Sequence, residues 1–138
     1  MSSVVKSNRT PGQLEVNTMA LDLCCYTLHI TSNPKHFPQD QSAFTERIRD
    51  NVIQIHAYCW VANNIYVGDS LSRYNTRIEY EAKAIDCCNT LMALIEIAQK
   101  MFHLESRRIR YWMKKTKDLR TVIYAWKESD VHRLKPGR

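Results

Sequence analysis

Residues 106–138 read SRRIRYWMKKTKDLRTVIYAWKESDVHRLKPGR, and the helix that they predict sets what the rest of the chain must supply. Six of its residues recur at intervals of 3, 4, 3, 4 and 3: Ile109, Trp112, Thr116, Leu119, Ile123 and Trp126. That spacing places them on one stripe of an α-helix, and the stripe needs other helices to pack against. Ser106 suits the N-cap position, because its hydroxyl can accept hydrogen bonds from the free N–H groups of the first turn.

The same stretch carries the positive charge of the chain. From Arg107 onward it holds 11 Lys or Arg residues against 3 acids, a net charge of +8, whereas the remaining residues have 9 basic and 11 acidic side chains, a net charge of −2. The excess is larger than solubility alone requires. A cationic helix of this kind indicates a polyanionic partner such as nucleic acid.

Seven basic residues off the apolar stripe form the candidate nucleic-acid-binding site: Arg107, Arg108, Arg110, Lys114, Lys115, Lys117 and Arg120. Four of them recur at intervals of 3, 4 and 3, which suits a helix that follows a phosphate backbone. No base-reading motif is present, so we expect binding to the backbone or to shape. The competing interpretation is a solvated face whose acidic counterpart lies on the preceding helix.

Three more helices are predicted before this one, over residues 13–31, 41–67 and from 71 or 75 to 103. The first carries two heptad rows, Leu14, Leu21 and Leu28 beside Val16, Leu23 and Ile30. The second carries Phe44, Ile48, Val52, Ile55, Cys59 and Ala62, and the third carries Ala84, Cys88, Leu91, Ile95, Ala98 and Phe102. Tyr58, Trp60, Val61 and Ile65 lie off the second stripe and are expected to face another helix or another subunit.

The predicted architecture is all-α, an antiparallel up-down-up-down four-helix bundle, because long helices with short connections must pack against their neighbours. We expect a flexible arm over residues 1–12, the bundle over 13–130 and a basic tail over 131–138. Phe37, between Pro34 and Pro38, is expected to fold back over the end of the core. Only 3 Gly and 4 Pro are present, which argues against a turn-rich β fold.

Composition and cysteine usage predict a cytoplasmic protein. No run of about 18 apolar residues exists, and the polar first ten residues lack a secretory signal core. The cysteines number five, and two pairs of them are adjacent: Cys24–Cys25 and Cys87–Cys88. Neighbouring residues on a helix do not form ordinary disulfides, so we expect reduced cysteines that fill helix packing.

No catalytic constellation, metal site or cofactor motif is predicted. The glycines are isolated, so no phosphate-binding loop exists, and the Glu-x-x-His motif of di-iron bundles is missing. His56 and Cys59 could meet on a helix, but no third group orients the pair. Glu79, Glu81 and Asp86 are interpreted as a solvated face. The protein is therefore not expected to be an enzyme.

Several short motifs together resemble a known family. They are a leucine-bearing first helix, Phe37-Pro38, Ala62-Asn63, residues 91–96 (LMALIE), Tyr111-Trp112 and Ala125-Trp126. The chain is similar, over about residues 14–130, to Avd-type proteins, the accessory variability proteins of diversity-generating retroelements. It also resembles the four-helix-bundle proteins of ribosomal RNA intervening sequences. It lacks the Asn-Ile-Ala-Glu-Gly ending that those relatives carry on helix two, which favours the Avd-type interpretation.

The resemblance implies a function and an assembly. Avd-type proteins are basic four-helix bundles that form a homopentameric barrel. They bind the cognate reverse transcriptase and its structured template RNA, and they support mutagenic cDNA synthesis without a catalytic site of their own. The alternative is a four-helix-bundle scaffold for protein partners with no nucleic-acid role. That interpretation would explain the surplus aromatic residues of the second helix.

Overall fold

The computed structural model describes residues 11–134, and their side chains from residue 15 onward. The described residues form four α-helices, namely α2 (Pro11–Thr31), α3 (Ser42–Asn63), α4 (Leu71–Phe102) and α5 (Ser106–Arg133), with a short 3-10 helix, η1 (Gln39–Gln41), before α3. No strand occurs within this range. The predicted all-helical fold is therefore confirmed. The expected arm over 1–12 and the end of the expected tail lie largely outside the described residues.

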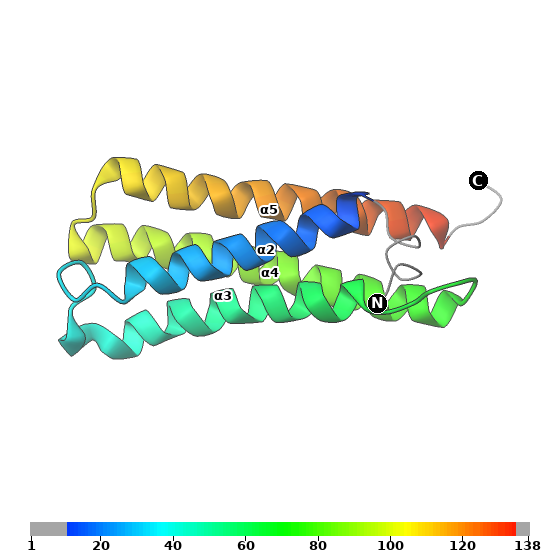
Figure 1. Ribbon diagram of the computed structural model, residues 1–138, viewed down its shortest axis with the longest axis horizontal. Coiled ribbons are helices and arrows are strands. Elements are labelled where there is room, and N and C mark those ends of the chain that lie inside the picture. Colours follow the sequence, from blue (N-terminus) through cyan, green and yellow to red (C-terminus); the bar gives the residue numbers. More distant parts are fainter. Residues whose placement is uncertain (1–10, 135–138) are drawn as a thin grey trace.

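The four helices lie side by side as a bundle (Figure 1). The connections α2–α3 and α4–α5 lie at one end, and the α3–α4 connection lies at the other, beside the start of α2 and the end of α5. Each helix packs on two others, because contacts join α2 to α3, α3 to α4, α4 to α5 and α5 back to α2. One face of every helix is therefore buried, and the opposite face meets solvent.

The predicted stripes of α3, α4 and α5 form the core. All six stripe residues of α5 are buried, and so are those of α3 and α4 except for the partly buried Phe44 and Phe102. Phe37 is only 4% exposed and packs edge-on against Phe102 and Trp112, with ring centroids 5.5 and 6.2 Å apart. The prediction that Phe37 covers the end of the core is confirmed.

Helix α2 buries only one of its two predicted apolar rows. Val16, Leu23 and Ile30 are buried, whereas Leu21 is 51% exposed and Leu28 is partly buried. The two rows lie on nearly opposite sides of the helix, since two residues correspond to about 200° of rotation. Among the described residues α2 packs on α3 and α5, so Leu21 faces solvent, whereas Leu28 lies at the edge of the core.

Helix α2 begins at Pro11, so residues 11 and 12 of the predicted arm belong to it, and three further helix ends differ from the predicted ones. Ser106 is not an N-cap but the first helical residue; Glu105 holds the cap position and makes no side-chain capping bond. Helix α3 stops at Asn63 rather than near residue 67. Helix α4 starts at Leu71, one of the two predicted starts, after Ser70, whose hydroxyl accepts from the Arg73 N–H at 3.2 Å. Helix α5 continues to Arg133, three residues into the predicted tail.

A buried ion pair joins α4 to α5 at the α3–α4 end of the bundle. The Arg77 guanidinium donates to both carboxylate oxygens of Asp130, at 2.8 and 2.5 Å, and lies over the Trp126 ring. Glu81 is fully buried beside this pair, with an oxygen 3.9 Å from Arg77 Nε. The prediction that Glu81 belongs to a solvated face is therefore wrong. Arg77 and Glu81 continue the spacing of the α4 stripe toward its N-terminus, which turns both side chains inward.

The Glu81 carboxyl is held in its protonated form. Burial and, after it, the neighbouring Asp130 carboxylate raise its pKa, whereas Arg77 and Lys127 lower it by less, and together these effects bring the pKa to about 10. Neither Glu81 oxygen accepts a hydrogen bond within the described part of the chain. A buried carboxyl without a hydrogen-bond partner costs far less when it is neutral than when it is charged, so the raised pKa agrees with this environment.

Candidate nucleic-acid interface

The outer face of α5 carries a row of exposed cations. Because the apolar stripe of α5 points into the bundle, the residues opposite to it face solvent: Arg107, Arg110, Lys114 and Lys117, here called the basic ridge. One helical turn rises about 5.4 Å, so the ridge presents about one cation per turn over three turns. This spacing allows neighbouring phosphates to be contacted without any change in the helix.

Most of the ridge is free to bind a ligand. Within residues 11–134, Arg107, Arg110 and Lys117 take part in no ion pair. Lys114 reaches Asp118 at 2.7 Å, but both side chains are largely exposed, at 74% and 51%. An exposed pair of this kind contributes about 0.3–0.5 kcal/mol on a helix. A phosphate can therefore displace Asp118 at low cost.

The other three predicted site residues lie on the flanks of the ridge. Lys115 forms an ion pair with Asp22 of α2 and lies over the rings of Tyr26 and Tyr111. Arg120 donates to the Asn89 side chain of α4 at 2.6 Å. These two residues fasten α5 to its neighbours. Arg108 is partly exposed and borders a hollow at the start of α5.

The competing interpretation requires acids of α4 to face the cations of α5. Glu79, Asp86 and Glu96 are exposed on α4, yet none of them forms an ion pair with α5 in the described structure. The only charge pair between these two helices among residues 11–134 is the reverse one, Arg77 of α4 with Asp130 of α5. The ridge is thus not neutralised by the neighbouring helix.

Two exposed tyrosines flank the ridge, and the sequence interpretation missed them. Tyr111 is 52% exposed and borders a hollow of about 320 Å³ with Tyr26, Glu105, Arg107 and Arg108. Tyr124 is 51% exposed and borders a second hollow of about 380 Å³ with Arg120, Thr121 and Ala125. The signal in the sequence was an arginine one turn before each tyrosine, Arg107 and Arg108 before Tyr111 and Arg120 before Tyr124, which places them on neighbouring positions of one helix surface.

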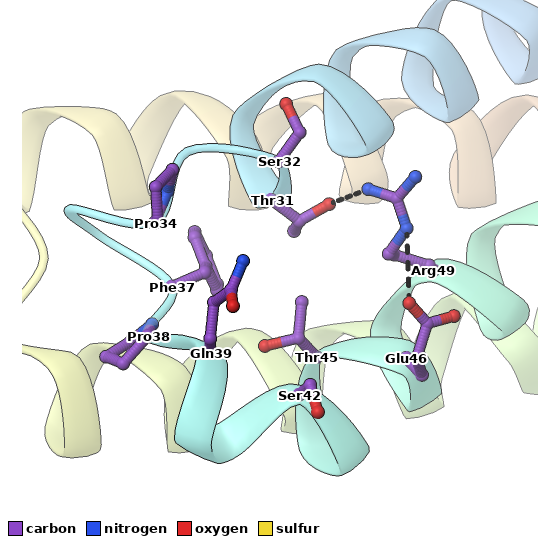
Figure 2. Close-up of a pocket in the computed structure, with 10 residues that line it drawn as sticks. All are labelled: Thr31, Ser32, Pro34, Phe37, Pro38, Gln39, Ser42, Thr45, Glu46 and Arg49. Atoms are coloured by element: carbon purple, nitrogen blue, oxygen red, sulfur yellow. Dashed lines mark hydrogen bonds and ion pairs between the residues drawn. The ribbon is translucent and has the colours of Figure 1, made fainter.

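Another pocket, of about 430 Å³, lies where α2 turns into α3 (Figure 2). Figure 2 shows Phe37 and Pro38 on the loop side and Arg49 on the α3 side. The Arg49 guanidinium already donates to the Thr31 hydroxyl at 2.8 Å and to the Leu28 carbonyl at 2.9 Å, and it pairs with Glu46 at 3.8 Å. Because the cation of this pocket is occupied by the protein itself, the pocket is a weaker candidate for an anion than the ridge.

The candidate nucleophile Cys59 lies in the core. It is 1% exposed, and burial raises the pKa of its thiol, as do the nearby Cys88 and Glu81. A nucleophilic cysteine needs a lowered pKa and access to substrate. The pair of His56 and Cys59 therefore offers no activated thiol. All five cysteines are free, and no group of three His, Cys, Asp or Glu residues that could hold a metal ion occurs among residues 11–134.

Comparisons with known proteins identify no family for this chain. No protein-family model, no curated protein and no solved structure matches the chain. Within the described part of the chain, none of the helices combines the length and apolar character needed to span a membrane.

Proposed function

We propose that this protein binds nucleic acid through the phosphates that lie along the basic ridge of α5. The observation that carries the proposal is the row of exposed cations, most of them unpaired within residues 11–134, on one face of a helix whose other face is core. Arginine can grip a phosphate through two parallel hydrogen bonds, and lysine adds a point charge. Binding of this kind depends on charge and tolerates changes of base sequence.

The specific role that we propose is that of a non-enzymatic accessory protein of a diversity-generating retroelement. The support is the resemblance to Avd-type proteins together with a four-helix bundle that carries its positive charge on one helix. In this role the cytoplasmic protein forms an up-down-up-down bundle, assembles as a homopentameric barrel and binds a reverse transcriptase and its structured template RNA. Its part in mutagenic cDNA synthesis is to hold the partners together.

Assembly into a pentamer would raise the affinity for a long RNA even if each basic ridge binds weakly. A pentamer repeats the ridge five times, and a long RNA that touches one copy meets the next at a high effective concentration. Modest single contacts then add to a tight complex. The proposal for nucleic-acid binding does not depend on this step, because one ridge on a monomer would bind weakly by the same contacts.

Charge reversal on the ridge tests the nucleic-acid proposal. The variant carries Arg110→Glu, Lys114→Glu and Lys117→Glu, and its affinity for a structured RNA is measured by fluorescence anisotropy. The matched control carries Lys35→Glu, Arg47→Glu and Lys100→Glu, which makes the same charge change at exposed positions away from α5. The ridge variant should lose most of its affinity for RNA and DNA, and the control should lose little. Equal losses for the two variants would show that only net charge matters.

Co-purification tests the retroelement role. The protein is expressed together with a reverse transcriptase of a diversity-generating retroelement and its template RNA, and the mixture is separated by size. We expect one complex that contains all three. Binding of RNA without the enzyme would leave the nucleic-acid proposal intact and remove the retroelement role.

A second candidate function, a scaffold for protein partners, is favoured by the exposed apolar side chains of α3. Trp60 is 56% exposed, Ile53 is 45% exposed and Val61 is 39% exposed. A tryptophan with this much exposure is a common anchor of protein interfaces. The two functions differ in their salt dependence, because burial of these side chains would not weaken as salt increases.

A further inference from the structure

We propose that the hollow beside Tyr111 holds an unpaired base of a single-stranded nucleic acid whose phosphates lie on the basic ridge. The inference rests on the proposed function and adds a binding subsite to it. It predicts that the protein distinguishes single-stranded from double-stranded RNA, which the ridge alone would not do.

The hollow has the size and lining of a small aromatic site. Its volume is about 320 Å³, at the lower end of the range of about 300–1,000 Å³ that is typical of small-molecule pockets. Tyr26 of α2 and Tyr111 of α5 form one wall, with their rings edge to face and the centroids 5.2 Å apart. Tyr26 is partly buried and braces the more exposed Tyr111 ring.

Tyr111 has neighbours on two sides along α5, with Lys115 on one side and the α5 residues that line the hollow on the other. Lys115, one turn after Tyr111, places its Nζ atom 5.0 Å from the ring centroid. The residues that line the hollow from α5, Arg107 and Arg108, lie one turn before Tyr111. We infer that a planar base entering the hollow meets the ring from that second side. Stacking on an aromatic side chain is the usual way in which proteins hold unpaired bases.

The charged residues around the hollow favour different positions for the phosphate and the base of a nucleotide. Arg107 belongs both to the hollow and to the basic ridge, so a phosphate held by it leaves the attached base within reach of Tyr111. The guanidinium of Arg108 lies close enough to Tyr26 to oppose the rise that burial causes in the pKa of its hydroxyl. Glu105 is the one acid that lines the hollow. Its carboxylate repels phosphate, and it can accept a hydrogen bond from a base amino group.

A duplex cannot use this subsite. Its bases are stacked on one another and paired at their edges, and only the phosphates and sugars are open to a helix face of this kind. A single strand can turn one base into the hollow and keep its phosphates on the ridge. The difference in affinity between single-stranded and double-stranded RNA therefore measures the contribution of the hollow separately from that of the ridge.

The test compares Tyr111→Leu and Tyr111→Phe with wild type. Affinity is measured for a short oligoadenylate RNA and for a blunt RNA duplex of the same length. Tyr111→Leu should weaken binding of the oligoadenylate about 5- to 100-fold, the range for loss of one stacked base, and should leave duplex binding unchanged. Tyr111→Phe keeps the ring and should bind as wild type does. Tyr66→Leu, a change at an exposed tyrosine of the α3–α4 connection, is the control.

The outcomes separate this inference from the proposed function. If Tyr111→Leu binds the oligoadenylate as wild type does while charge reversal on the ridge abolishes binding, the subsite is wrong and the ridge stands. If wild type binds neither RNA, both ideas fail. An equal loss for Tyr111→Leu on single strand and duplex would also overturn the subsite, because it would indicate a distorted α5 instead of a lost stacking surface.

Discussion

At the scale of single residues, the least expected feature is the charged cluster inside one end of the bundle. Arg77 and Asp130 form a two-bond pair between α4 and α5, and Glu81 lies beside them with a strongly raised pKa. Breaking a buried pair of this kind by removing one partner costs about 3–5 kcal/mol, because the other charge is left uncompensated. The cluster joins α4 to α5, and a protonated Glu81 keeps its total charge near zero.

Glu81→Gln tests the protonated state. The unfolded chain releases the Glu81 proton near pH 4.5, whereas the folded chain keeps it up to about pH 10, so this group makes wild type less stable as pH rises between those values. The loss is at most about 1.4 kcal/mol per pH unit. Glutamine imitates the protonated carboxyl and removes the dependence. We expect Glu81→Gln to gain stability relative to wild type from about pH 5 to about pH 9 in urea unfolding.

The control for this prediction is Glu79→Gln, at an exposed position on the same helix. Its stability should follow that of wild type at every pH. Parallel curves for wild type and Glu81→Gln would mean that Glu81 is ionised in the folded protein, and the description of the cluster would then be wrong.

At the scale of elements, α5 has two different faces, and the sequence predicted both of them. The spacing of Ile109 to Trp126 was sufficient to place the core stripe, because only a helix brings residues at those intervals together. The spacing did not lead us to predict that Glu81 is buried, since a carboxylate is normally expected to face solvent. The signal was present nonetheless, because Arg77 and Glu81 continue the apolar spacing of α4.

The surroundings of the other candidate site residues could not be predicted from the sequence, because they depend on contacts with other helices. Lys115 and Arg120 were predicted as ligand-binding residues, yet their partners, Asp22 and Asn89, lie on other helices far away in the chain. Tyr111 was passed over because its value as a binding surface comes from Tyr26 of α2. Contacts between helices of this kind follow from the packing of the bundle and not from local spacing.

Truncation of the α5 stripe measures how much this helix contributes to the core. Leu119 is 0% exposed, so Leu119→Ala removes buried methyl groups and leaves a cavity. We expect a loss of about 2–5 kcal/mol in the free energy of unfolding, measured with urea. Thr121→Ala, two residues further along on the exposed side, should change it by no more than about 0.5 kcal/mol. Similar small effects for both would show that the stripe is not core.

At the scale of the whole molecule, the described bundle exposes the basic ridge of α5 and a number of apolar side chains, among them those on the outside of α2 and α3. Leu21, Ile53 and Trp60 are each at least 45% exposed. An apolar surface of this kind is expected to be covered in an assembly, because stable homomeric interfaces have apolar centres. The ridge and the apolar residues lie on different helices, so assembly and nucleic-acid binding need not compete.

Light scattering tests the assembly. A pentamer has a mass of about 81 kDa, five times the 16.2 kDa of one chain. The double variant Ile53→Glu with Trp60→Glu should shift the mass toward that of the monomer, because it places charges in the proposed interface. Met101→Glu, an exposed apolar position near the end of α4, is the control and should not change the mass. A wild-type mass of 16.2 kDa at micromolar concentration would exclude the pentamer.

The salt dependence of RNA binding shows whether phosphates lie along the basic ridge. Each phosphate that a cation neutralises releases counterions, so the slope of log affinity against log salt counts the contacts. Replacing Arg110, Lys114 and Lys117 with glutamine should reduce the magnitude of that slope by about 2–3, since each contact contributes about 0.7–0.9. Equal affinity and equal slope for wild type and variant would show that the basic ridge is a solvated surface with no ligand.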